Sequence, residues 1–243
     1  MQFYDNDTLA NAFVLYEHAN NYIDQDHDYK FRTDYYYRIK IFNKEAYDHA
    51  NISIPFYDKE TIVAINAVTY NLKGEVIDKT WLKQDAIFTT KETEYWNETK
   101  FTLPNLKEAS VIEYVYSVIS PYSRIDDWYF QSDIPKLESK YTAAILGNYK
   151  YNIRLVGSKP LDEKDISYTE DCVHVPGMGT GGCVNYLFGM KNIPAFEEED
   201  YMLSKKNYLS RLILDQLSYT DVYGAVKKYT KTWEDADKTL KRL

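Results

Sequence analysis

The stretch Tyr29-Lys30-Phe31-Arg32-Thr33-Asp34-Tyr35-Tyr36-Tyr37-Arg38-Ile39-Lys40-Ile41-Phe42 carries the clearest fold signal in the chain. Its side chains alternate with a period of two. Tyr35, Tyr37, Ile39 and Ile41 fall on one side, and mostly polar residues fall on the other. Successive side chains of a β-strand point to opposite faces of a sheet. The pattern therefore predicts one long strand with a buried face and a polar face.

Two pairs of segments predict β-hairpins, because each pair flanks a short turn that contains glycine. The first hairpin joins residues 61–70 to 75–78 through Asn71-Leu72-Lys73-Gly74, and the second joins 142–145 to 149–156 through Gly147-Asn148. Residues 111–119 alternate in the same way and predict a further strand. Residues 210–217 fit a strand or a helix, and the alternation around Leu212 and Leu214 favours the strand.

These segments predict an all-β fold, an antiparallel β-sandwich with a short C-terminal helical segment. The 243 residues are 44% hydrophobic and 16% aromatic, which is enough to bury a full core. We expect residues 1–220 to form the sandwich and residues 221–243 to form a helical segment with Thr232 as its N-cap. Leu240 and Leu243 of that helix await a packing partner, so we expect the natural chain to continue.

The charge distribution argues against a nucleic-acid-binding protein. Lys and Arg number 29 and Asp and Glu number 37, which gives a formal net charge of −8. Nucleic-acid binders normally carry a basic stripe, whereas basic and acidic residues are interleaved here. The densest charge run, Glu197-Glu198-Glu199-Asp200, is acidic and is typical of a solvated loop. No apolar run approaches the roughly 18 residues that a membrane-spanning helix needs.

Cys172 and Cys183 enclose a glycine-rich segment for which three interpretations compete. A phosphate-binding loop would need Lys followed by Ser or Thr after the last glycine, where Cys183-Val184 stands. A metal site would use Cys172, His174 and Cys183, with Met178 as a weak fourth ligand. A disulfide needs only two strands that return across a flexible turn, and we favour this interpretation. It implies an oxidising compartment, and it leaves the sequence without a predicted metal or cofactor.

Cys183 is also the candidate nucleophile of a cysteine-dependent hydrolase or transferase. Gly182-Cys183-Val184 superficially resembles the nucleophile segment of transglutaminase-like and papain-like enzymes. Such chemistry needs a histidine base, usually well downstream of the cysteine. All four histidines precede Cys183, and a disulfide would consume the thiol. The sequence therefore predicts no catalytic residue in this chain.

Aromatic and acidic residues supply weaker candidate sites. Trp81, Trp96 and Trp128 could stack on sugar rings, although core packing is the commoner role of tryptophan. Asp126 and Asp127 could form the paired carboxylates of a glycosidase. Adjacent strand residues point to opposite faces of a sheet, so we favour a turn that precedes a strand at this position.

Several segments, taken in their order and spacing, resemble one family. The segments are YRIKIFNKE (37–45), AVTYNLKG (67–74), FTLPNLK (101–107), SVIEY (110–114), DWYFQSDIP (127–135), MKNIPA (190–195) and EDYM (199–202). Together they resemble the N-terminal domain of transglutaminase-like proteins of Bacteroidetes type, known as domain of unknown function 3857. The resemblance covers nearly the whole chain.

The resemblance implies a β-rich domain that stands before a papain-like transglutaminase domain in an exported protein, periplasmic or secreted. The catalytic Cys, His and Asp of such proteins belong to that later domain. We expect this catalytic domain to follow the given sequence, and we expect a signal peptide to precede the given sequence. The first hypothesis is a non-catalytic accessory domain that positions the catalytic domain or binds a peptide or a glycan. The alternative is a cysteine-dependent enzyme that uses Cys183.

Overall fold

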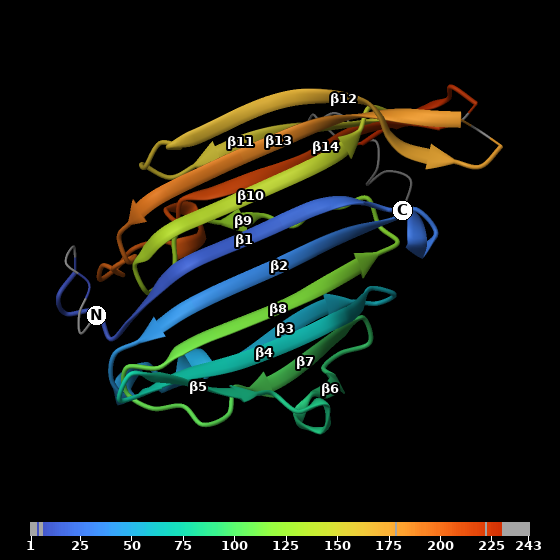
Figure 1. Cartoon of the computed structure of the whole chain (residues 1–243). Coiled ribbons are helices and arrows are strands. Elements are labelled where there is room, and N and C mark those ends of the chain that lie inside the picture. Colours follow the sequence, from blue (N-terminus) through green and yellow to red (C-terminus); the bar gives the residue numbers. More distant parts are fainter. Residues whose placement is uncertain (1–3, 5–6, 178, 222, 230–243) are drawn as a thin grey trace.

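The computed structural model describes residues 4, 7–177, 179–221 and 223–229. Its largest sheet contains β1 (Ala12–Asp24), β2 (Lys30–Ile41), β4 (Thr61–Lys73), β5 (Val76–Trp81), β8 (Val111–Ser120), β10 (Lys136–Leu146), β12 (Glu163–Val175) and β13 (Gly179–Ile193). The strand order is β12-β13-β10-β1-β2-β8-β4-β5 (Figure 1). Neighbouring strands are antiparallel, except that β1 and β10 are parallel.

Strand β2 confirms the prediction made from the alternating stretch and lies in the middle of the large sheet. It pairs with β1 along one edge and with β8 along the other. Phe31, Ile39 and Ile41 on one face are buried. Arg32 and Asp34 on the other face form an ion pair at 2.7 Å. The period-two pattern therefore separates the inner face of the large sheet from its outer face.

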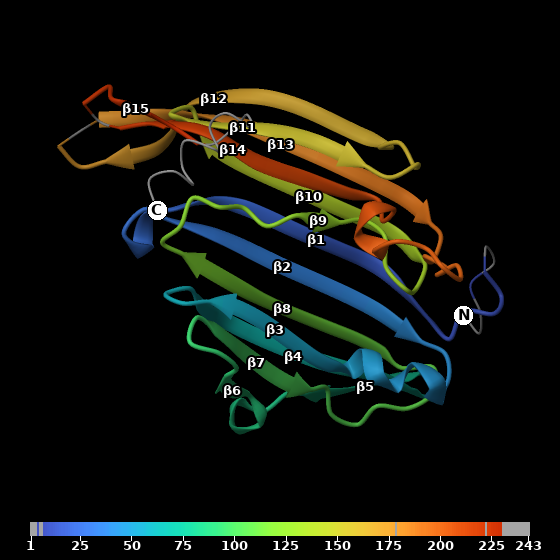
Figure 2. The same ribbon diagram turned by 180° about the vertical axis from the view of Figure 1, so that it is seen from behind.

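Two smaller sheets cover opposite ends of the inner face (Figure 2). A four-stranded sheet contains β9 (Trp128–Tyr129), β11 (Tyr149–Val156), β14 (Arg211–Thr220) and β15 (Val226–Lys228). A three-stranded sheet contains β3 (Asn51–Tyr57), β6 (Phe88–Lys91) and β7 (Trp96–Thr102). Short 3-10 helices are η1 (Gln25–His27), η2 (Lys44–Ala50), η3 (Gln84–Ala86) and η4 (Lys205–Asn207). The predicted all-β, sandwich-like fold is confirmed.

A hydrophobic cluster lies under each small sheet. Under the four-stranded sheet the cluster includes Phe188 and Leu212, and under the three-stranded sheet it includes Phe101 and Ile112. Tyr37 of β2 packs against both clusters. The two halves of the core therefore meet on the central strand.

The two predicted hairpins have different outcomes. Strands β4 and β5 pair across the turn at Gly74, whose φ is +63°, so the first hairpin is confirmed. The second prediction is wrong, because β10 and β11 on either side of Gly147 belong to different sheets. Both edges of β10 are already paired, with β1 and with β13. The short turn at Gly147-Asn148 therefore carries the chain from one layer to the other.

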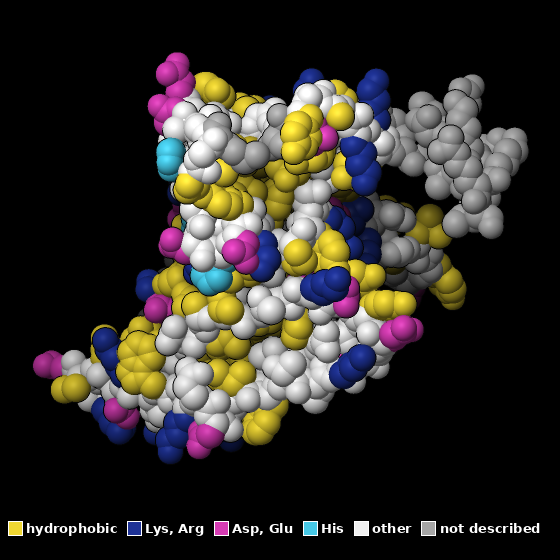
Figure 3. Space-filling model, turned by 90° about the vertical axis from the view of Figure 1, so that its right-hand side faces the viewer, with side chains coloured by type: hydrophobic (Ala, Val, Ile, Leu, Met, Phe, Trp, Pro, Cys, Tyr) yellow, Lys and Arg dark blue, Asp and Glu magenta, His cyan; other side chains and the backbone are white. Residues whose placement is uncertain are grey.

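The C-terminal part of the chain bears on two further predictions. Residues 210–217 lie largely in β14, which confirms the strand interpretation. The helix predicted from Thr232 lies outside the described residues. Within the segment 221–243, the described part contains the short strand β15. Among the described residues, none of the helical segments has the length and hydrophobicity that a transmembrane helix requires. Acidic and basic side chains are interspersed on the face shown in Figure 3.

Gly157 is a point where the backbone tolerates only glycine. It follows β11 with φ +104°, and a Cβ added there would lie 2.6 Å from the Cα of Ser210. We expect Gly157→Ala to lower the free energy of unfolding by about 3 kcal/mol, because backbone strain adds to a steric clash. Urea denaturation measures this change. Gly74→Ala, where the added Cβ meets no atom within 4 Å, should cost only about 1 kcal/mol. Equal costs at the two positions would contradict the close approach.

Candidate functional site

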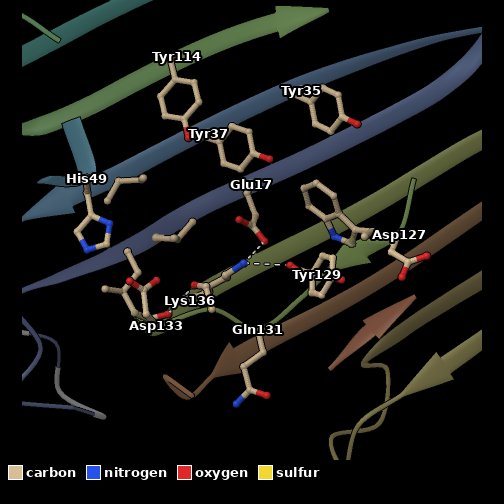
Figure 4. Close-up of a pocket in the computed structure, with 15 residues that line it drawn as sticks. Glu17, Tyr35, Tyr37, His49, Tyr114, Asp127, Tyr129, Gln131, Asp133 and Lys136 are labelled. Atoms are coloured by element: carbon tan, nitrogen blue, oxygen red, sulfur yellow. Dashed lines mark hydrogen bonds and ion pairs between the residues drawn. The ribbon is translucent and has the colours of Figure 1, made fainter. Parts of the chain in front are cut away.

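A cavity of about 300 Å³ lies over Tyr37, at the seam where the two halves of the core meet. Its floor is the inner face of the large sheet, and its wall comes from residues 127–136, which lead through β9 into β10. His49 of η2 and Asp127 lie on opposite sides of the cavity (Figure 4). We take this cavity as the candidate functional site, because it combines a concave space with buried charged groups.

Strand β9 holds the wall in the second layer. Trp128 pairs with Leu212 of β14, which anchors this part of the wall to the four-stranded sheet. The chain then returns to the large sheet through Pro135, whose carbonyl accepts a hydrogen bond from the Val14 N–H at 2.9 Å. The segment between these two anchors therefore faces the floor.

A buried ion pair joins the floor to the wall. Lys136 Nζ lies 2.6 Å from Glu17 Oε1, and the two side chains are only 5% and 4% exposed. Lys136 also donates to the Tyr129 carbonyl at 3.1 Å (Figure 4). Ser139 Oγ donates to Glu17 Oε1 at 2.6 Å, and Trp128 Nε1 donates to Ser139 Oγ at 3.1 Å. Burying a charge costs several kcal/mol unless partners compensate it, and this network supplies them.

Stacked tyrosines form much of the floor. The ring centroids of Tyr35 and Tyr116 are 4.7 Å apart, and those of Tyr37 and Tyr114 are 4.8 Å apart. Trp128 lies 6.4 Å from Tyr35 and 6.4 Å from Tyr37. Burial raises the pKa of all four phenols above its ordinary value. These hydroxyls are therefore neutral hydrogen-bonding groups at neutral pH.

Asp127 supplies an acidic group at one side of the cavity. Burial raises the pKa of its carboxyl, and the Arg211 guanidinium, 3.4 Å away, opposes the rise. Asp126 is exposed and pairs with Arg124 at 3.0 Å. The two adjacent carboxylates have separate partners and directly precede β9. The predicted strand after these residues is confirmed as β9, whereas residues 123–127 form an irregular segment instead of the predicted turn.

The cavity offers a ligand aromatic surface and hydrogen-bonding groups. Its buried ammonium and carboxylate neutralise each other, so the arrangement suits a polar, uncharged group better than an ion. No cluster of three or more His, Cys, Asp or Glu side chains in the described part of the chain could hold a metal ion.

The two cysteines lie away from this cavity, in the hairpin of β12 and β13. Cys172 and Cys183 form a disulfide with their Cα atoms 5.7 Å apart, and Cys183 is 1% exposed. The bridge spans an irregularity in the strand pairing that follows Thr169. The disulfide interpretation is confirmed. The metal interpretation, which needs Cys172 and Cys183 as free thiolates beside His174, is wrong for the bridged protein.

The three tryptophans singled out from the sequence do not form one site. Trp128 is buried beside the cavity and packs in the core. Trp81 ends β5 and is 59% exposed, opposite Val68 of β4 on the outer face of the large sheet. Trp96 begins β7 in the three-stranded sheet and is 40% exposed. Each tryptophan therefore has a different environment and calls for a separate functional argument.

Glu17 and Lys136 are the site residues that sequence reasoning missed. They are 119 positions apart in the chain and meet only because β1 and β10 pair in parallel. Strand β1 shows no clean alternation, because Glu17 and Asn21 are buried polar residues within it. A lone lysine after Pro135 carries no signal of burial in a sequence.

Comparison with known proteins places the chain in a family. The sequence model of the family described as Domain of Unknown Function with solved-structure structure (DUF3857) matches residues 27–197, well over half of the chain. The chain belongs to the DUF3857 family. The matched range leaves out β1. Glu17, one partner of the buried ion pair, therefore lies outside the family match. No curated protein matches the sequence.

Solved structures share the fold of this DUF3857 chain. Among them is the crystal structure of a "putative protease" from Parabacteroides distasonis ATCC 8503, with a TM-score of 0.66 and 18% sequence identity. The likeness covers 84% of this chain and 40% of that chain. The DUF3857 chain thus corresponds to less than half the length of its structural relative.

The ion pair can be tested by double substitution. We expect Lys136→Met to lower the free energy of unfolding by about 3–5 kcal/mol, because it leaves the Glu17 carboxylate buried without its partner. Glu17→Leu should cost a similar amount, and the double variant should cost less than the sum. Lys140→Met, on the same strand but in partly exposed pairs with Glu138 and Glu163, should cost at most about 1 kcal/mol. Additive losses in the double variant would contradict the coupling.

The buried tyrosines predict a loss of stability in alkali. Their folded-state pKa values lie above the unfolded value of about 10, so the stabilisation is complete below that pH and is lost as the pH rises above it. Tyrosinate absorbance should show Tyr35 and Tyr37 ionising only when the protein unfolds, at a pH above the ordinary tyrosine value. Ionisation of every tyrosine near pH 10 in a folded protein would contradict this.

Proposed function

We propose that the chain is a non-catalytic accessory domain of an exported transglutaminase-like protein. The observation that carries the proposal is the state of Cys183. Its sulfur is bonded to Cys172, and the residue is 1% exposed. A nucleophilic cysteine needs a free thiolate that a substrate can reach. The alternative, an enzyme that uses Cys183, lacks both conditions in the bridged state.

The difference in length between this chain and its structural relative supports an accessory role. This chain corresponds to 40% of a longer chain that is described as a "putative protease". The remainder of a chain of that length has room for a separate catalytic domain, as the family resemblance implies. In this proposal, the sandwich positions the catalytic domain. The reacting residues all belong to that catalytic domain.

The disulfide supports export. Disulfides persist in oxidising compartments such as the periplasm or the extracellular space, whereas cytosolic thiols are kept reduced. The bridge closes a hairpin whose turn carries Gly177 and Gly179, both at positive φ. In the chain-entropy model a loop of this size is stabilised by roughly 3 kcal/mol. A periplasmic or secreted location would keep that contribution intact.

A matched pair of cysteine variants tests the proposal. The chain and its variants Cys172→Ala and Cys183→Ala are exported to the periplasm and assayed with peptide and amine-acceptor substrates. We expect no turnover from any of the three proteins, and no free thiol in the unfolded wild-type chain. Cys172→Ala leaves the Cys183 thiol free, so a nucleophilic Cys183 would make this variant active. Turnover by Cys172→Ala that is absent in Cys183→Ala would overturn the proposal.

A further inference from the structure

The outward face of the three-stranded sheet forms a regular platform. Ile54 of β3 and Thr99 and Phe101 of β7 point inward and are buried. Alternate residues of the same strands therefore point away from the large sheet. We call this outward set the platform, and its members are Ser53, Tyr57, Phe88, Trp96, Glu98 and Lys100.

The register of the strands arranges the platform in rows. Tyr57 lies opposite Trp96 in the first row, and Lys100 lies between Ser53 and Phe88 in the last row. Glu98 occupies the row between them, opposite Pro55. A strand rises about 3.4 Å per residue, so the aromatic rings of Trp96 and Phe88 stand about 14 Å apart along the strands. The platform thus has an aromatic ring in its first row and in its last row, with Glu98 in the row between them and with Lys100 and Ser53 beside Phe88 in the last row.

The aromatic end at Trp96 is exposed and held in place by its neighbours. Trp96 is 40% exposed and Tyr95 is 50% exposed. The Tyr57 ring contacts Trp96, Tyr95 and Tyr122 with centroid distances of 5.3, 6.2 and 5.8 Å. The Tyr122 hydroxyl donates to Asp58 Oδ2 at 2.7 Å. Rings held in this way lose little conformational entropy when a ligand stacks on them.

The middle and last rows of the platform carry hydrogen-bonding groups of both charges. Lys100 pairs with Glu98 and lies 3.4 Å from Glu92. Ser53 Oγ donates to Glu98. Lys100 is half exposed, so solvent or a ligand reaches it. Cations and anions alternate here, and the platform has no single-sign field that would select an ionic ligand.

We propose that the platform binds a neutral glycan chain. A pyranose ring presents C–H groups on its faces and hydroxyls at its rim, so it can stack on Trp96 or Phe88 while its hydroxyls reach Glu98, Lys100 and Ser53. A nucleic acid would need a basic surface. A protein partner would have to desolvate the charged centre, whereas protein interfaces are depleted of charge at their core.

This inference rests on the proposed accessory function. It adds the class of ligand that the accessory domain would bind. The two ideas can fail separately. Thiol and turnover assays report on Cys183 and say nothing of glycans. Glycan retention reports on the platform and is independent of the disulfide.

Affinity electrophoresis tests the platform with defined glycans. The chain is run through gels that contain hydroxyethyl cellulose, laminarin, xylan or galactomannan, which are neutral, or polygalacturonate, which is acidic. We expect at least one neutral glycan to retard the chain. Trp96→Ala and Phe88→Ala should each weaken that retention by about tenfold, the scale of one aromatic stacking contact. Both side chains are exposed, so both variants should fold, and circular dichroism checks that they do.

Trp81→Ala is the matched control, because Trp81 is equally aromatic and exposed but lies on the large sheet. Its retention should equal that of the wild-type chain. The proposal is overturned if no neutral glycan retards the chain, if only polygalacturonate does, or if Trp81→Ala weakens retention as much as the platform variants do.

Discussion

The buried ion pair between Lys136 and Glu17 links three separated parts of the chain, and the arrangement of the sandwich depends on it. Glu17 comes from β1, Lys136 begins β10, and the Tyr129 carbonyl that also accepts from Lys136 belongs to β9 in the second layer. Neither charge can be left alone in this low-dielectric position, because an unpaired buried ion costs several kcal/mol. The ion pair therefore stabilises both the parallel pairing of β1 with β10 and the placement of β9 over it.

The seam above this pair follows from the same constraint. The chain between β8 and β10 contains β9, which lies in the second layer and places the Tyr129 carbonyl within hydrogen-bond distance of Lys136. The two small sheets cover opposite ends of one face, and the cavity lies beside β9 where the two core clusters meet. Tyr37 fills the position where the two core clusters meet and stacks on Tyr114. Tyrosine suits such a seam, since its ring packs in the core while its hydroxyl meets polar neighbours.

The functional arguments separate the interior of the molecule from its surface. The cavity at the seam is built of groups that largely satisfy each other, which favours a structural contribution to holding the two halves together. The platform on the three-stranded sheet has exposed aromatic rings and exposed polar groups, which favours contact with an outside partner. The bonded, buried Cys183 and the exposed aromatic residues of the platform are the two observations that agree with the proposed accessory role.

The sequence by itself determined the local elements. Period-two alternation identified β2 and β8, the glycine turn identified the β4–β5 hairpin, and the cysteine spacing identified the disulfide, because each of these signals depends on residues close together in the chain. Only the tertiary structure decided the rest. The turn at Gly147 joins two sheets instead of two paired strands, since both edges of β10 are occupied by strands distant in sequence. Strand register brings Glu17 next to Lys136 and aligns the rows of the platform. This register depends on packing between strands that are distant in sequence, so no local sequence pattern predicts it.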